Sequence, residues 1–141
     1  LRPLLKEVVD ETFNKVTVDG DMSTNDTVLA FANGFSRVKV NSRSQSEIQS
    51  LRDAMVKVCQ YLAEKIVGDG ERITKVVKVT VEGASDDVSA ERVARAIANS
   101  LLVKTSWYGC DPNWGRLVDA AGYAKAGLAF ERLDLFYEDV E

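Results

Sequence analysis

Hydrophobic residues recur at helical spacing along the middle of this chain. Over residues 45–67 one stripe is formed by six apolar side chains, namely Ile48, Leu51, Met55, Val58, Leu62 and Ile66. Ser44 followed by Glu47 matches a capping box, so the helix is expected to begin at residue 45. Gly68 stands where a residue of left-handed conformation would end the helix. This is the strongest helix signal in the sequence.

Three further helices are predicted by the same criteria. The first covers residues 3–14 and has Pro3 at its first position, where a proline costs nothing. The second follows Ser85 as its N-cap, and the third begins at Asp111 as its N-cap and ends at Gly122. The buried side of the second helix is formed by Val93, Ile97 and Leu101.

Other segments are rich in β-branched residues or alternate between apolar and polar side chains. Residues 16–21 are expected to be extended, and strands are predicted over 27–32, 75–81 and 133–138. Helices and strands are intermixed, and no internal repeat or linker separates them. The pattern therefore favours one α/β (α+β) domain over residues 1–141.

Composition narrows the class of protein. The 141 residues are 45% hydrophobic and 28% charged with a net charge of −4, which is typical of a soluble globular protein. Clustered Lys and Arg are missing, so nucleic acid is disfavoured as the partner. No apolar stretch is long enough to span a bilayer, and no secretory signal is present, so a cytoplasmic protein without a membrane partner is expected. The two cysteines, Cys59 and Cys110, are expected to be reduced thiols.

Histidine is absent from the whole chain. This excludes Ser-His-Asp and Cys-His catalysis within these residues and removes the commonest ligand of zinc. Any chemistry must use carboxylates, Lys, Thr, Ser, Tyr or backbone groups, or a nucleophile from another chain.

Two polar runs resemble ligand loops without matching them. Residues 19–25 place oxygen ligands at the first, third, fifth and seventh positions of a calcium loop, but Thr24 replaces its turn glycine and Ala30 its bidentate acid. A side-chain-bonded turn explains this run as well. Residues 68–75 resemble a phosphate loop, but the lysine opens a strand instead of a helix. A helix end and turn explain that run, with Glu71 in a loop where an acid can face a cleft.

The run at residues 111–116 has a structural explanation in most of its positions. Asp111 caps a helix, and Pro112 and Trp114 begin and pack it, so Asn113 and Arg116 are the residues left without a structural role. Three groups of motif residues in this chain together resemble the ornithine acetyltransferase (bifunctional glutamate N-acetyltransferase) family of arginine biosynthesis. They are residues 13–14, 17–21 and 23–27, then 70–71 with 74–75, then 102–105 with 109, 111–116 and 122–123.

The resemblance implies a layered αββα sandwich and an enzyme that cleaves itself before a threonine. The new N-terminal threonine would take acetyl from N-acetylornithine and pass it to glutamate, with its own amine as base. This chain would be the central part of the catalytic beta chain. The nucleophile would precede Leu1, the C-terminal substrate-binding segment would follow Glu141, and the oxyanion groups would lie on a companion alpha chain. A second copy of the heterodimer would complete a heterotetramer.

The resemblance assigns few site residues to this chain. Glu71 matches a substrate-binding position, where a carboxylate would pair with an ammonium group of ornithine or glutamate. Four more residues belong to family motifs with structural support as the expected role, and they are Asp26, Lys75, Asn113 and Arg116. The family pattern has Gly-Ala where Arg72 and Ile73 follow Glu71. No cofactor or metal is implied, and acetyl-CoA stays open as the acetyl donor.

Two alternatives to the enzyme component remain at this point. One is a non-catalytic fragment or a diverged assembly or binding module, and the weaker one is a calcium-binding module. The enzyme hypothesis further predicts that the isolated chain cannot transfer acetyl, because its reactive hydroxyl would come from outside these residues.

Overall fold

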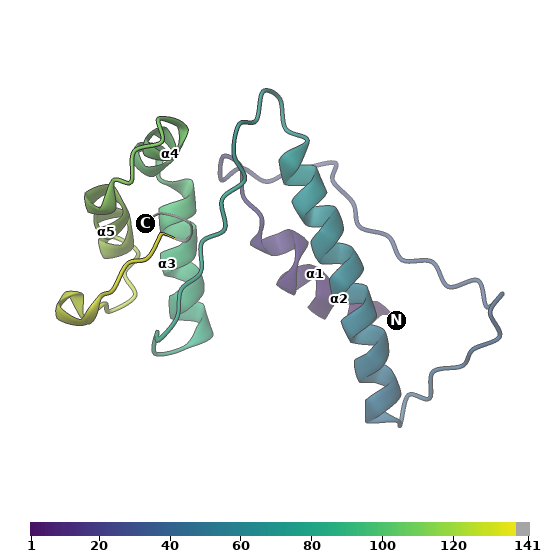
Figure 1. Ribbon diagram of the computed structural model, residues 1–141. Helices are drawn as coiled ribbons and strands as arrows, with labels where there is room; N and C mark the ends of the chain where they lie inside the picture. The colour runs from purple at the N-terminus through teal and green to yellow at the C-terminus, as the bar shows by residue number, and fades with distance from the viewer. Residues whose placement is uncertain (138–141) are drawn as a thin grey trace. The chain divides into compact units, whose positions relative to one another are not determined.

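The computed structural model describes residues 1–137, which fold as two compact units (Figure 1). The first unit contains residues 1–16 and 21–71, and the second contains residues 17–20 and the chain from residue 72 onward. The single domain predicted over residues 1–141 stays a prediction. None of the helices within the described part is both long and apolar enough to cross a membrane.

The first unit is built on two helices that pack on each other, α1 (Arg2–Glu11) and α2 (Gln45–Gly68), with the 3-10 turn η1 (Phe13–Lys15) following α1. Figure 1 shows α1 lying against α2. Arg52 of α2 forms an ion pair with Glu11 of α1. The side chains that become buried are Val8, Thr12, Cys59 and Ala63. Burial of these few small residues gives the first unit a thin core.

The predicted start of α2 is confirmed, and the helix ends one residue later than predicted, without the predicted left-handed glycine. The Ser44 hydroxyl accepts a hydrogen bond from the Glu47 amide at 3.5 Å. The Glu47 carboxylate accepts instead from the amide of Asn41, at 2.7 Å, so the reciprocal bond of a capping box is replaced. Gly68 is the last helical residue, and Asp69 follows it with a φ of −99°. A glycine in left-handed conformation is therefore not used at this helix end.

The second unit gathers three helices, namely α3 (Asp87–Asn99), α4 (Leu101–Tyr108) and α5 (Trp114–Gly122), and the 3-10 turn η2 (Phe130–Arg132). Its core is formed by Val103, Leu117 and Ala120, against which three partly buried side chains pack, namely Ile97, Trp107 and Tyr137. Each of the three helices contributes to this cluster, which fixes their packing.

The sequence predicted one helix through Leu101, whereas the chain breaks at Ser100. The Ser100 hydroxyl accepts a hydrogen bond from the Val103 amide at 3.3 Å, so this residue is the N-cap of α4. Leu101, predicted to be buried, is 77% exposed. The caps of α3 and α5 are Asp86 and Asn113, each displaced from the predicted Ser85 and Asp111.

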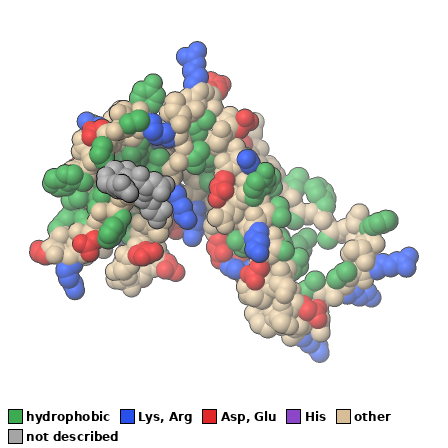
Figure 2. Space-filling model, in the orientation of Figure 1, with side chains coloured by type: hydrophobic (Ala, Val, Ile, Leu, Met, Phe, Trp, Pro, Cys, Tyr) green, Lys and Arg blue, Asp and Glu red, His purple; other side chains and the backbone are tan. Residues whose placement is uncertain are grey.

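None of the predicted strands forms a hydrogen-bonded ladder within residues 1–137. Residues 27–32, 75–81 and 133–137 run without regular secondary structure, and the rest of the last predicted strand lies outside the described residues. A strand needs a neighbour to pair its N–H and C=O groups, and the described residues supply none. Large hydrophobic side chains stay exposed on these segments, among them Leu29, Phe31 and Val76. Figure 2 shows hydrophobic side chains at the surface in green. The layered sandwich therefore stays a prediction.

The stability that the N-cap of α3 contributes depends on pH. The Asp86 carboxylate accepts hydrogen bonds from the Ser89 amide at 2.8 Å and from the hydroxyls of Ser85 and Ser89, at 2.9 and 3.0 Å. These bonds, with the Ser89 amide first, lower the pKa of Asp86. Because the folded-state pKa lies below the unfolded one, the stabilisation is present above the ordinary carboxyl pKa and is lost as the pH falls through the lowered value.

We therefore expect the melting temperature of the wild-type chain to exceed that of Asp86→Asn near pH 7, and the difference to shrink as the pH is lowered to about 3. Thermal unfolding of both proteins at each pH measures this difference, and the other acidic residues cancel because both proteins contain them. A difference that grows toward acid would contradict the lowered pKa.

Candidate functional site

The first motif group divides between the two units. Residues 17–20 belong to the second unit, where side-chain hydrogen bonds fix them to α3 and α4. The Thr17 hydroxyl donates to the Asn99 side-chain oxygen at 2.6 Å, and the Lys104 ammonium donates to the carbonyl oxygen of Val18. Gly20 has a φ of +87°, and a Cβ there would lie 3.6 Å from the Asn99 side chain. The turn is thus shaped by its glycine and fixed by two helix side chains.

Arg116 joins α5 to α4. Its guanidinium donates to the Leu102 carbonyl oxygen at 2.8 Å and to the Thr105 hydroxyl oxygen at 3.1 Å. The Thr105 hydroxyl in turn donates to the Leu102 carbonyl, at 2.9 Å. The structure therefore brings two parts of the third motif group together, and Arg116 is the residue that joins them.

Asn113 also has a structural explanation. Its side-chain oxygen accepts a hydrogen bond from the Arg116 amide at 3.2 Å, which caps α5, and its amide nitrogen donates to the Asp111 carboxylate at 2.9 Å. Both hydrogen-bonding groups of the side chain are occupied by neighbours in the sequence. Asn113 is therefore a helix cap, with Asp111 supporting it from the preceding turn.

Glu71 lies in the turn that follows α2, and its side chain is exposed. Within residues 1–137 it makes no hydrogen bond or ion pair, so its carboxylate is available to a ligand. The next residue, Arg72, has a φ of +54°. This left-handed conformation suits glycine, which the family pattern has at this position, and it costs a residue with a side chain about 1 kcal/mol. The departure from the pattern therefore places a side chain in a conformation that favours glycine.

The other two candidates differ in their contacts, since Lys75 bonds a distant helix and Asp26 a near neighbour in the sequence. The Lys75 ammonium donates to the Tyr108 carbonyl oxygen at 3.3 Å, at the C-terminal end of α4. Asp26 is exposed, and its amide donates to the Ser23 hydroxyl oxygen at 3.0 Å. The Ser23 hydroxyl also accepts from the Asn25 amide, so this run forms the side-chain-bonded turn that the sequence offered as the alternative to a calcium loop. No group of three or more Cys, Asp or Glu side chains in the described part could hold a metal ion.

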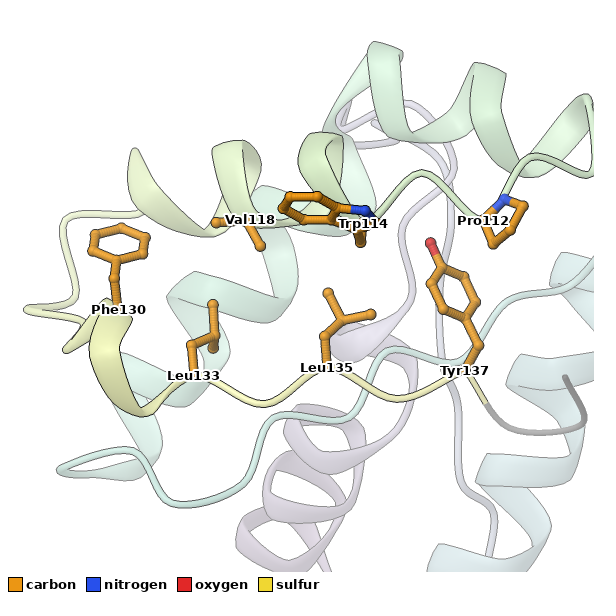
Figure 3. A pocket seen from close by; sticks show the side chains of 7 residues that line it. All are labelled: Pro112, Trp114, Val118, Phe130, Leu133, Leu135 and Tyr137. Carbon is orange, nitrogen blue, oxygen red and sulfur yellow. The ribbon is translucent and has the colours of Figure 1, made fainter. Parts of the chain in front are cut away.

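An apolar groove of about 550 Å³ lies on the second unit, between α5 and the segment that follows η2 (Figure 3). We call it the α5 groove. Figure 3 shows Leu133 and Leu135 pointing toward the helix and the Tyr137 hydroxyl pointing toward Trp114 and Pro112. The residues that line it are Pro112, Trp114, Val118, Phe130, Leu133, Leu135 and Tyr137. The α5 groove has the composition of a packing surface more than of a catalytic site.

The comparisons with known proteins decide the family. The model of the ArgJ family matches this chain over residues 1–141. The chain belongs to the ArgJ family. The family resemblance expected from the three motif groups is thereby confirmed.

Individual relatives extend over the same residues. The arginine biosynthesis bifunctional protein ArgJ of Thermotoga neapolitana is 49% identical over 98% of this chain, which spans 35% of that protein. The glutamate N-acetyltransferase of Methanopyrus kandleri is 48% identical over 100% of this chain, which spans 36% of that protein. The chain thus spans about a third of the curated ArgJ relatives it matches.

A solved ArgJ structure supports the fold. The crystal structure of arginine biosynthesis bifunctional protein argJ from Bacillus halodurans is 40% identical, with a TM-score of 0.85. The match covers 91% of this chain and 60% of the crystallised one. The fold of the matched residues is therefore similar to that of an ArgJ protein.

The sequence analysis did not identify Asn99 as a contact of residues 17–20. It included Lys104 in a motif but gave it no role. Lys104 bonds a carbonyl 86 residues earlier in the chain, and Asn99 contacts Thr17 across 82 residues. Such a long-range contact leaves no periodic pattern in the sequence. The one available signal was that Lys104 and residues 17–20 belong to the same family resemblance.

Proposed function

We propose that this chain is part of an enzyme that transfers an acetyl group from N-acetylornithine to glutamate in arginine biosynthesis. The observation that carries the proposal is the ArgJ family match over all 141 residues. Relatives named as a glutamate N-acetyltransferase and as bifunctional proteins of arginine biosynthesis, which are 48% and 49% identical to this chain, support the reaction class.

In this proposal the nucleophile is the hydroxyl of an N-terminal threonine that is freed by self-cleavage outside these 141 residues. The hydroxyl attacks the acetyl carbonyl carbon, the threonine amine takes its proton, and the ornithine amine leaves with a proton. The acetyl-threonine ester is then attacked by the amine of glutamate, which regenerates the hydroxyl and releases N-acetylglutamate. The absence of histidine from the chain is consistent with this base, and acetyl-CoA is an alternative donor.

Glu71 is the proposed substrate-binding residue of this chain. Its side chain is exposed and makes no hydrogen bond or ion pair within the described residues, so its carboxylate is available to pair with a substrate ammonium. Asn113 and Arg116 support the fold through the contacts given above. The remaining reacting groups, including those that stabilise the oxyanion, are assigned to a companion alpha chain, within a cytoplasmic heterotetramer of two such heterodimers.

We expect Glu71→Ala in the full-length enzyme to lower kcat/KM about 10- to 150-fold, because a charge-assisted hydrogen bond to the substrate is lost. Steady-state kinetics with N-acetylornithine and glutamate measure the effect. Glu82→Ala is the matched control, since Glu82 is also an exposed carboxylate in a loop. Unchanged kinetics of the Glu71 variant would remove it from the site, and acetyl transfer by the isolated 141-residue chain would overturn the assignment of the nucleophile.

A further inference from the structure

The turn that follows α2 carries two opposite charges on consecutive residues. Glu71 and Arg72 are both exposed, and within residues 1–137 their side chains pair neither with each other nor with another group. One peptide bond joins the two residues, so covalent geometry keeps them close. The next cation along the chain, Lys75, is already bonded to the Tyr108 carbonyl oxygen. Arg72 is therefore a cation beside Glu71 that is available to a ligand.

The backbone of Arg72 has a conformation that arginine adopts only at a cost. Its φ of +54° lies in the left-handed region, which glycine adopts freely and which residues with a side chain seldom adopt. No contact of the Arg72 side chain within the described residues offsets this cost. Residues in such conformations are concentrated at active sites and ligand-binding sites. A role in ligand binding would account for an arginine at this position.

The two substrates of the proposed reaction differ in the charge of their side chains. Each has its reacting nitrogen and a carboxylate on the same carbon. The side chain of N-acetylornithine ends in an ammonium group, whereas the side chain of glutamate ends in a carboxylate. An enzyme that passes acetyl between them through one threonine must accept both charges. A carboxylate such as Glu71 would by itself attract the first side chain and repel the second.

An arginine next to Glu71 removes this conflict. Its guanidinium is planar, stays charged over the whole physiological pH range and binds a carboxylate through two parallel hydrogen bonds. A lysine would offer only a point charge without that geometry. The consecutive acid and base at positions 71 and 72 thus offer a partner of opposite charge to each of the two substrate side chains.

We propose that Arg72 is a specificity-determining residue that pairs with the side-chain carboxylate of glutamate, whereas Glu71 pairs with the side-chain ammonium of N-acetylornithine. Each residue is then used in one half of the reaction, because the two substrates react in turn. The proposal rests on the proposed function for the identity of the substrates. Since the family pattern has glycine at this position, this chain should favour glutamate more strongly than the same chain with glycine there.

The test is Arg72→Gly in the full-length enzyme, which restores the residue of the family pattern. We expect kcat/KM for glutamate to fall at least about tenfold, because charge-assisted hydrogen bonds are lost. The value for N-acetylornithine should stay the same or rise, because its ammonium no longer meets a like charge. The melting temperature should also stay the same or rise, because glycine suits the left-handed conformation. An equal fall for both substrates would overturn the proposal.

Arg37→Gly is the matched control. Arg37 is also exposed, has a φ of +57°, and its side chain makes no hydrogen bond or ion pair within residues 1–137. The substitution therefore changes the same side chain in the same backbone conformation, and both kcat/KM values should stay unchanged. Arg72→Lys keeps the charge and should recover part of the glutamate value. Equal effects of the two glycine variants, or no recovery by lysine, would count against the contact with the carboxylate.

Glutamate binding, measured by isothermal titration calorimetry, distinguishes failure of this proposal from failure of the proposed function. Binding to the wild-type enzyme at least about tenfold more tightly than to Arg72→Gly, without acetyl transfer, would support the carboxylate contact and contradict the proposed function. Acetyl transfer with equal glutamate values in the two proteins would overturn the contact alone. A wild-type enzyme that neither transfers acetyl nor binds glutamate would overturn both.

Discussion

Leu117→Ala should lower the free energy of unfolding of this chain by about 2–5 kcal/mol. Leu117 is 8% exposed and lies in the cluster with Val103 and Ala120. Removing three carbons there leaves a cavity at the packing point of α5, and small neighbours such as Ala120 cannot fill it. Urea unfolding followed by circular dichroism measures the change.

The control for this variant is Leu101→Ala, in the neighbouring helix α4. Leu101 is 77% exposed, so its truncation should change stability by less than about 0.5 kcal/mol. If the two variants were equally unstable, the described cluster could not be the core of the second unit.

Arg116→Met should cost about 1–3 kcal/mol, because methionine keeps most of the apolar stem and removes the guanidinium that bonds Leu102 and Thr105. The lost hydrogen bonds join α5 to α4, and their donor is charged. Denaturant unfolding of the isolated chain measures it.

The control is Arg92→Met on α3. Arg92 is exposed and forms no ion pair or hydrogen bond within residues 1–137, so its replacement should be nearly neutral. A full-length Arg116→Met enzyme that keeps its stability and loses acetyl transfer would assign Arg116 to the substrate instead of the fold.

Helices were predictable from this sequence where periodicity and caps agreed. The stripe of α2 and its Ser44 cap predicted a 24-residue helix to within one residue at its end. Helix α4 was not predicted, because residues 102–105 were interpreted only as part of a family motif and because Ser100 looks like an ordinary helical residue until its side chain caps the next helix. A segment that is assigned to a family motif can therefore also be a helix, because the same residues belong to both.

Strands were less predictable than helices for a physical reason. The bonds of a helix lie within its own segment, whereas a strand such as residues 75–81 needs a second segment to pair with. The alternation of Val77, Val79 and Val81 with polar residues favours a strand. The described residues contain no second strand that pairs with this segment.

The candidate site was predictable only as far as family motifs reach. Glu71 was predicted because it matches a family motif. Within the described residues it makes no hydrogen bond or ion pair, so its geometry neither supports nor excludes a role in substrate binding. Asn113 and Arg116 were the residues without a structural role in the sequence, and the structure gives each of them one. The contacts of Arg116 reach back to Leu102 and Thr105, and the cap that Asn113 makes was assigned to Asp111, so neither role followed from the run 111–116 alone.

The hydrogen bond from Lys104 to residue 18 has a consequence for how this protein tolerates change. The lysine contacts a main-chain oxygen, which is the same whatever side chain the residue carries. Val18 itself is largely exposed, so its identity is free to drift while the attachment persists. Position 104 is more restricted. A shorter side chain could not reach the carbonyl oxygen of Val18, and a neutral side chain could not form a charge-assisted hydrogen bond with it. We therefore expect substitutions at position 104 to be tolerated less well than substitutions at position 18.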